Sequence, residues 1–189
     1  NFVGEKINDW STNTILNHFK VEVVGTTDDP CDSLHFHHKI KTAQNRITVV
    51  PTFRPDQLLN IDQPSLFSTY IQRLAAVSKV SISTFDDLLS AIKERHDYFH
   101  GLGCRASDHG QIYLFAEDYT IGEVKSIFNK ALQGLSVSPI ESAKYKSAIQ
   151  YELAVLDWSR GWVQQFHLGA IRNNNSRLLN TLGKDIGVD

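Results

Sequence analysis

The stretch ITVVPTFRPD, residues 47–56, decides the fold. Its first seven residues are apolar or β-branched, as in a strand that is buried on both faces of a sheet. The strand must stop where RPD begins, because Pro55 fixes its own backbone and removes a hydrogen-bond donor. The stretch therefore predicts a strand over 47–53 that ends in residues capable of chemistry.

Three other segments follow the same pattern. The segment 21–27, VEVVGTT, ends at DDP; CRAS, 104–107, ends at DHG; and WVQQFHLG, 162–169, ends in a polar loop. Helical patterns separate the four segments, over 31–44, through the region that holds SLFSTYIQRLAAVS and the segment capped by Thr84, and over 120–133 and 139–160. Strands that alternate with helices predict right-handed βαβ units and hence a parallel sheet in an α/β fold.

Each of the four predicted strands ends in polar side chains. These are Asp28 and Asp29, Arg54 and Asp56, Asp108 and His109, and His167. The carboxyl ends of parallel strands form the ligand-binding face of α/β folds. Four such endings predict a single polar site at one end of a barrel or open sheet.

The residues leave more than one role open for each candidate. His167 could bind a metal, polarise a carbonyl or shuttle a proton, or it could be a buried histidine bonded to a neighbouring carbonyl. Arg54 has a planar guanidinium that can clamp a carboxylate, or it could pair with Asp56 or another carboxylate. Asp108 could act as a base or orient an imidazole, or it could cap a helix.

Several other features favour structural roles. For Asp28 and Asp29 the start of the next helix is favoured, with Asp29 or Asp32 as its cap. The pattern HFHH, 35–38, lies in a predicted helix, where residues two apart face different directions, and HDYFH, 96–100, lacks the glutamate of a helical zinc site. The cysteines and tryptophans are expected to pack in the interior; they are Cys31, Cys104, Trp10, Trp158 and Trp162.

Composition limits the class of protein. A chain of 189 residues is long enough for one domain with a full hydrophobic core. A net charge of −2 with a pI near 6.5 gives no basic footprint for nucleic acid. No apolar run approaches the roughly 20 residues of a membrane span, and two lone cysteines favour a reducing compartment. We expect a cytoplasmic protein that binds neither nucleic acid nor membrane.

Four motifs, in this order, closely resemble the uronate (glucuronate) isomerase family. They are VVGTTDDPCDSLHFH (23–37), VVPTFRPD (49–56), GCRASDHG (103–110) and RGWVQQFHLGAIRNNNSR (160–177). The resemblance covers nearly the whole chain. It implies the (β/α)8 TIM-type barrel of the amidohydrolase superfamily, and the interconversion of D-glucuronate with D-fructuronate and of D-galacturonate with D-tagaturonate.

The resemblance also assigns roles to residues of this chain. Arg54 matches an active-site arginine that would hold the substrate carboxylate, and Asp108 and His167 match further active-site residues. His167 would contact a substrate hydroxyl or carbonyl, and Asp108 would orient it or another group of the site. Arg172 and the asparagines 173–175, Asn173 first among them, would contact sugar hydroxyls or shape the pocket.

The family's chain is longer than 189 residues, so residues 1–189 are expected to be the central part of one barrel domain, with about four of its strands and extra helices. The family's metal-binding His-x-His and its catalytic aspartate have no counterpart here. A divalent metal, zinc in the family, would therefore have its principal ligands outside this chain, and the chain by itself would be inactive. The complete enzyme is expected to be a homo-oligomer, and the alternative activity is that of a metal-dependent hydrolase of the same superfamily.

Overall fold

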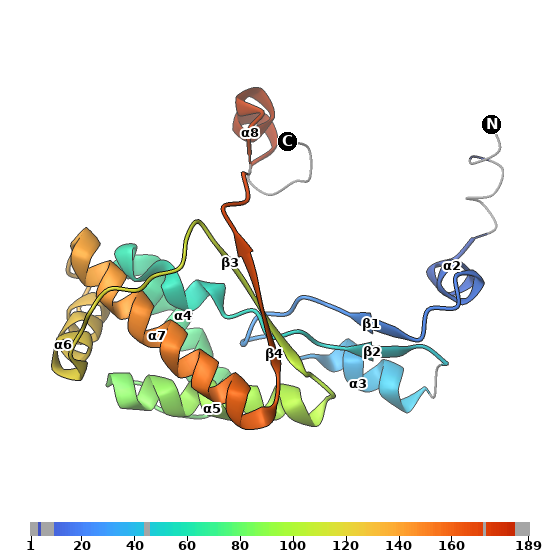
Figure 1. Ribbon diagram of the computed structural model, residues 1–189, viewed down its shortest axis with the longest axis horizontal. Coiled ribbons are helices and arrows are strands. Elements are labelled where there is room, and N and C mark those ends of the chain that lie inside the picture. The colour runs from blue at the N-terminus through green and yellow to red at the C-terminus, as the bar shows by residue number, and fades with distance from the viewer. Residues whose placement is uncertain (1–3, 5–9, 44–45, 172, 184–189) are drawn as a thin grey trace.

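A computed structural model describes residue 4 and residues 10–43, 46–171 and 173–183. Four short strands alternate with helices along the chain (Figure 1). The elements are α2 (Thr12–His18), β1 (Val23–Gly25), α3 (His35–Thr42), β2 (Thr48–Val50), the 3-10 helix η1 (Asp56–Asp62), α4 (Pro64–Ser78), α5 (Phe85–Gly101), β3 (Ala106–Gln111), α6 (Ile121–Leu132), α7 (Pro139–Arg160), β4 (Val163–Leu168) and α8 (Ser176–Leu182).

The strands run parallel and follow one another in chain order. β1 pairs with β2 from Val23 opposite Thr48, and β3 pairs with β4 from Ala106 opposite Val163. Phe53 joins the two pairs, because it forms parallel bridges with both Asp28 and Ser107. The predicted parallel arrangement of about four strands is confirmed.

Strand β3 is longer than the sequence indicates. The predicted strand ends at residue 107, whereas β3 continues to Gln111, and its last three residues pair with Phe166, His167 and Leu168 of β4. The polar run DHGQ lacks apolar alternation, and the neighbouring strand supplies the hydrogen bonds that extend it. Asp108 and His109 thus lie inside a strand and point to opposite faces of the sheet.

The hydrophobic core lies among η1 and helices α4 to α7, the helical body of Figure 1. Aromatic side chains meet there edge to face, with Phe67 against Phe128 and Tyr145, and Phe85 against the same two rings. Such pairs add to the area that the rings bury. The core therefore fixes the helices that support β3 and β4.

In the helical body, α5, α6 and α7 each begin at a capping residue. Thr84, Thr120 and Ser138 each cap a helix as part of a capping box, in which the side chain of the third helical residue bonds back to the cap residue. Helix α7 spans residues 139–160 as predicted, with proline at its first position.

The start of helix α3 differs from the prediction. Helix α3 begins after Leu34 without a side-chain cap, whereas Asp29 and Asp32 each accept a hydrogen bond from a backbone N–H within the turn of residues 29–32. The prediction that one of these aspartates caps the helix was wrong.

Trp158 was expected to pack in the interior, but it is 82% exposed on α7, whereas Trp162 is buried.

Both cysteines are buried, as predicted, and burial raises the pKa of each thiol to about 11. Among the described residues, no helix combines the length and the apolar character that a membrane crossing demands.

Candidate functional site

Arg54 is held by two carboxylates at the end of β2. Its Nε donates to Oδ2 of Asp56 at 2.8 Å, and its Nη1 donates to Oδ2 of Asp108 at 3.1 Å. The backbone is fixed as well, because the N–H of Arg54 donates to the carbonyl of Asp28 at 2.9 Å. The ion pairs that the sequence left open as an alternative for Arg54 are thus present, and they orient its planar guanidinium.

Gly110 makes room for this guanidinium. A Cβ atom at position 110 would collide with Nη2 of Arg54 and would lie 3.1 Å from Oδ2 of Asp56. The N–H of Gly110 also donates to both carboxylate oxygens of Asp56, at 3.1 and 3.2 Å. A glycine in the strand here allows the close approach of another group, in this case the arginine.

Asp108 links Arg54 to His167. Nδ1 of His167 lies 2.6 Å from Oδ1 of Asp108, a distance that gives an ion pair when the imidazole is protonated. No donor among the described side chains is aligned with Oδ1 as a hydrogen bond requires, so the contact is close but is not a hydrogen bond. The side chain of Asp108 is 6% exposed and that of His167 is 47% exposed. The imidazole is therefore the more accessible part of the pair.

The side chain of Gln165 completes this face of the sheet. Its Nε2 lies 3.1 Å from Nε2 of His167, two residues along β4. When the amide donates there, the hydrogen of a neutral imidazole must sit on Nδ1, which points toward Asp108. We use the name open face for the sheet face that carries Asp108, Gly110, Gln165 and His167. Along β4 the residues of this face are the exposed ones, and those between them are half-buried.

Two residues of the predicted site, Arg172 and Asn173, follow β4 in the sequence. Asn173 has a left-handed backbone with φ of 57° and follows the strand on its way to α8, which stands apart from the helical body (Figure 1). Arg172 lies outside the described residues. The structure therefore brings together Arg54, Asp108 and His167, and the roles of Arg172 and Asn173 in a site stay predictions.

The opposite face of β3 and β4, which we name the helix face, carries a polar network that the sequence did not reveal. Asp157 of α7 is buried, and its Oδ2 accepts hydrogen bonds from Oγ of Ser107 at 2.6 Å and from Nε2 of Gln164 at 3.2 Å. Nε2 of His96 lies 3.1 Å from its Oδ1. A buried carboxylate needs such donors to remain charged. The signal in the sequence was a charged residue within the apolar pattern of YELAVLDW.

His109 belongs to the same network. Its Nε2 lies 3.0 Å from Oγ of Ser107, and its ring stacks on Phe166 with centroids 5.0 Å apart. Burial lowers the pKa of His109, so the neutral imidazole is favoured. Of the predicted pair Asp108 and His109, only Asp108 reaches the open face.

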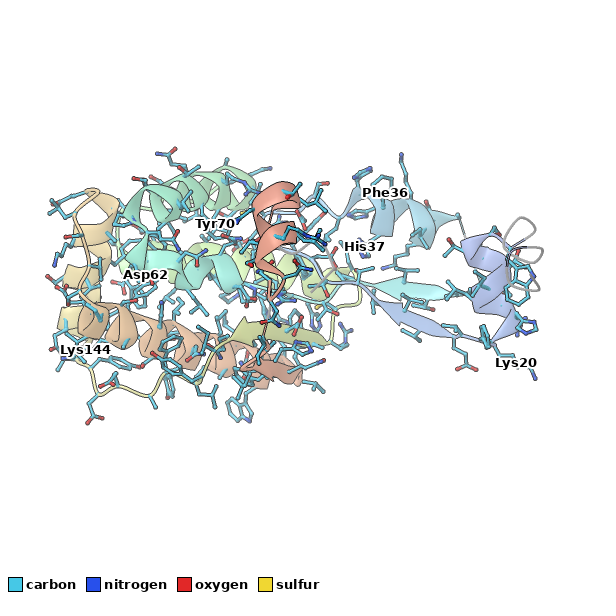
Figure 2. The ribbon with its side chains drawn as sticks, turned by 90° about the horizontal axis from the view of Figure 1, so that it is seen from above. Lys20, Phe36, His37, Asp62, Tyr70 and Lys144 are labelled. Carbon is cyan, nitrogen blue, oxygen red and sulfur yellow. The ribbon has the colours of Figure 1, made fainter. Side chains whose placement is uncertain are left out.

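A small pocket lies where β1 gives way to α3. Its lining includes Asp28, Phe36 and His37. Figure 2 labels Phe36 and His37 on α3. Oγ1 of Thr26 donates to Oδ2 of Asp28 at 2.5 Å and lies 2.8 Å from Nε2 of His37. Asp28 is thus hydrogen-bonded to Thr26, and Nε2 of His37 lies 3.8 Å from its Oδ2. His37 is a buried residue of the HFHH pattern, which lies in a helix as predicted.

Metal binding needs several ligands in one place. Within the described part of the chain, no three His, Cys, Asp or Glu side chains gather into a group that could hold a metal ion. These residues thus do not fit a complete metal site, and no step of a reaction is assigned to a metal.

Known proteins match the sequence of this chain. The family model described as glucuronate isomerase matches residues 5–189. Uronate isomerase of Bacteroides fragilis is 46% identical over 181 residues, which are 96% of this chain and 39% of the relative. The uronate isomerase of Opitutus terrae is 46% identical over 186 residues, or 98% of this chain and 39% of the relative.

Solved structures agree with the sequence relatives. The crystal structure of uronate isomerase from Thermotoga maritima superposes with a TM-score of 0.88 at 30% identity, over 96% of this chain and 40% of that one. Glucuronate isomerase from Caulobacter crescentus gives a TM-score of 0.82 at 28% identity, over 94% and 37% of the two chains. The fold of these relatives is a TIM-type barrel, so the expected α/β class, as part of such a barrel, is confirmed.

The chain spans about two fifths of the length of the curated relatives that it matches. These relatives are named uronate isomerase. The match over residues 5–189, together with identities of 46%, shows that the chain belongs to the glucuronate isomerase family.

Proposed function

We propose that the whole protein, of the length of its curated relatives, is an aldose–ketose isomerase. It would interconvert D-glucuronate with D-fructuronate and D-galacturonate with D-tagaturonate. Family membership supports the class of reaction, and the relatives are named uronate isomerase. The observation that carries the proposal is the contact of Arg54, Asp108 and His167 on one face of the sheet.

The reaction moves a proton from C2 to C1 of the open-chain sugar acid through an enediol. It needs a base, a group that stabilises the negative charge of the enediolate, and a clamp for the distal carboxylate. Arg54 is assigned to the clamp, because a guanidinium matches a carboxylate in shape and charge. His167 is assigned to a hydroxyl or carbonyl of the substrate, because its imidazole is the exposed member of its pair with Asp108.

Charge balance sets a condition for this clamp. Asp56 and Asp108 together carry two negative charges beside the single positive charge of Arg54. Protonated His167, 2.6 Å from Asp108, would bring the cluster of four side chains to neutrality. A substrate carboxylate would then meet no net repulsion, so we propose that Asp108 serves both Arg54 and His167.

The metal is part of the proposal and lies outside the residues described here. The family is related to a superfamily that is usually metal-dependent, and we propose a divalent metal, zinc, with its principal ligands in other parts of the whole protein. Such an ion would supply electrophilic stabilisation of the enediolate. We further propose a cytoplasmic homo-oligomer that acts on small sugar acids and binds neither nucleic acid nor membrane.

The decisive experiment replaces Arg54 in the whole protein. Arg54→Ala should lower kcat/KM for glucuronate by about 100-fold, mainly through KM, because a charged contact to the substrate of about 3 kcal/mol is lost. Arg73→Ala removes an exposed arginine of α4 and should leave both constants within about twofold. Equal kinetics of Arg54→Ala and the wild type would remove Arg54 from the site.

A second measurement concerns the 189-residue chain by itself. We expect no turnover of glucuronate or galacturonate by this chain, because the described residues hold no complete metal site. Turnover by the purified chain, with its intact mass checked, would show that the residues of this segment suffice for the reaction.

A further inference from the structure

Asp157 ties together the two strands that present Asp108 and His167. It accepts from Ser107 of β3 and from Gln164 of β4, both at the same carboxylate oxygen. Ser107 and Gln164 are paired residues in the register of the two strands. One carboxylate therefore fixes both strands at the same level, from the helix face of the sheet.

The hydrogens of this network can be assigned from its donors and acceptors. The single hydroxyl hydrogen of Ser107 points to Asp157 at 2.6 Å, so its oxygen can only accept from His109. Nε2 of His109 must then carry a hydrogen toward Ser107 at 3.0 Å. The amide of Gln164, which lies farther from this nitrogen at 3.5 Å, donates to Asp157 instead. Bonds thus run in one direction from His109 through Ser107 to Asp157, and a change in any member leaves a buried group unmatched.

The second carboxylate oxygen of Asp157, Oδ1, also has a buried partner. His96 of α5 approaches Oδ1 at 3.1 Å, and its ring stacks on Trp162 with centroids 3.7 Å apart. Trp162 directly precedes β4, and Phe53 contacts the rings of both His96 and Trp162. The carboxylate of Asp157, on α7, therefore has partners on α5, β3 and β4.

Asp108 lies between two members of the network. Ser107 and His109 point to the helix face, and the residue between them must point to the open face. There Asp108 contacts Arg54 and His167 at 3.1 and 2.6 Å. A shift of β3 by a fraction of an ångström would alter both contacts.

We propose that Asp157 is a positioning residue of the isomerase site, which acts through Ser107 and Gln164 to place Asp108 and His167. The proposal rests on the proposed function for its kinetic part. A positioning role of this kind is distinct from substrate contact, because Asp157 lies on the opposite face of the sheet. A misplacement of about 1 Å in a site can lower a rate by about 100-fold.

The test uses the whole protein and removes the hydroxyl between Asp157 and His109. Ser107→Ala should lower kcat/KM for glucuronate about tenfold, the effect of losing one hydrogen bond to a charged group. Ser147→Ala is the matched control, because it removes a buried hydroxyl from α7 that bonds to Ala143 and Glu117 and not to the strands. This control should keep kcat/KM within about twofold at a similar loss of thermal stability.

A double variant separates positioning from general weakening. If Ser107 acts through Asp108, then Ser107→Ala should have little further effect on kcat/KM in an Asp108→Asn background. Losses that multiply in full, or an equal loss of activity in Ser147→Ala, would overturn the proposal.

Hydrogen exchange of β3 and β4 tests the positioning role without relying on isomerase activity. Ser107→Ala and Asp157→Asn should speed amide exchange over residues 106–111 and 163–168, and Ser147→Ala should not. Absence of uronate turnover in the wild type would refute the isomerase, whereas unchanged exchange in both variants would refute the positioning role of Asp157.

Discussion

The open face and the helix face of β3 and β4 are both polar, yet they differ in what their polar groups do. On the helix face Ser107 and His109 are buried and bonded to protein groups, with Asp157 at the centre. On the open face Asp108 pairs with an arginine and with the half-exposed His167. Neighbouring residues of one strand therefore have different roles, since alternate side chains point to opposite faces.

The difference between the two faces shows how a strand with many polar residues can be part of a stable fold. Buried polar groups are tolerated when their partners are supplied, as α5 and α7 supply them to the helix face. Reachable groups of opposite charge are placed on the other face, where a ligand can compete for them. Substitutions on the helix face should thus act on stability or position, and those on the open face should act on activity.

The largest effect is expected from Phe53→Ala, in the core beside the helix face, where Phe53 contacts His96 and Trp162. Phe53 is fully buried, forms parallel bridges with Asp28 and with Ser107 of β3, and meets Phe99 edge to face at 5.0 Å. Its truncation should lower the free energy of unfolding of the whole protein by about 3–5 kcal/mol, through lost transfer energy and a cavity. Urea denaturation of the purified variant measures the change.

The matched control is Phe36→Ala, which removes an exposed ring from α3. Its effect on the free energy of unfolding should stay within about 0.5 kcal/mol. Similar losses in both variants would mean that the packing of the helix face does not stabilise the sheet, and the contrast between the faces would fail.

A smaller effect, on activity, is expected from Gly110→Ala on the open face. The new methyl group would collide with Arg54 and press on Asp56, so the guanidinium must move. We expect kcat/KM for glucuronate to fall about tenfold while the free energy of unfolding changes by less than about 1 kcal/mol. Steady-state kinetics and urea denaturation together test this.

Gly122→Ala is the matched control for Gly110→Ala. Position 122 lies in α6 with no atom within 4 Å of an added Cβ, and alanine favours a helix by about 0.5–1 kcal/mol over glycine. The control should gain slight stability at unchanged activity. A Gly110→Ala variant with unchanged kcat/KM would show that the position of the guanidinium does not matter for the reaction.

The sequence predicts the open face better than the helix face, for physical reasons. Parallel strands bring their carboxyl ends to one side, so the strand endings are sufficient to predict that Arg54, Asp108 and His167 meet. The extension of β3 could not be predicted, because CRASDHGQ has no apolar alternation and owes its pairing to β4. The role of Ser107 depends on Asp157, fifty residues away, and only the packing of α7 brings the two together.

The exposure of Trp158 has a related cause. Helix α7 has apolar residues on its buried side and also at Tyr151, Val155 and Trp158, which are exposed. Helical spacing alone does not tell which of two apolar stripes faces the core. The number of aromatic residues in a helix thus overstates how much of it is buried.

The smallest expected effect is a change in pH dependence in the variant His109→Gln. Burial lowers the pKa of His109, although Asp157, Asp56 and Asp108 oppose the shift. Below its ordinary pKa of about 6.5 the unfolded chain therefore binds a proton that the folded protein excludes, so His109 makes stability fall as the pH falls. Glutamine can donate to Ser107 in its place and does not titrate.

Urea denaturation at pH 7.5 and pH 5.5 measures this difference. The wild type should lose more free energy of unfolding between these two values than His109→Gln does, even if the variant is less stable at pH 7.5. The buried imidazole of His109 on the helix face would then stay neutral in the folded protein at pH 5.5 more than it does in the unfolded chain. Equal losses in the two proteins would show that the imidazole of His109 takes up a proton in the folded state as readily as in the unfolded one.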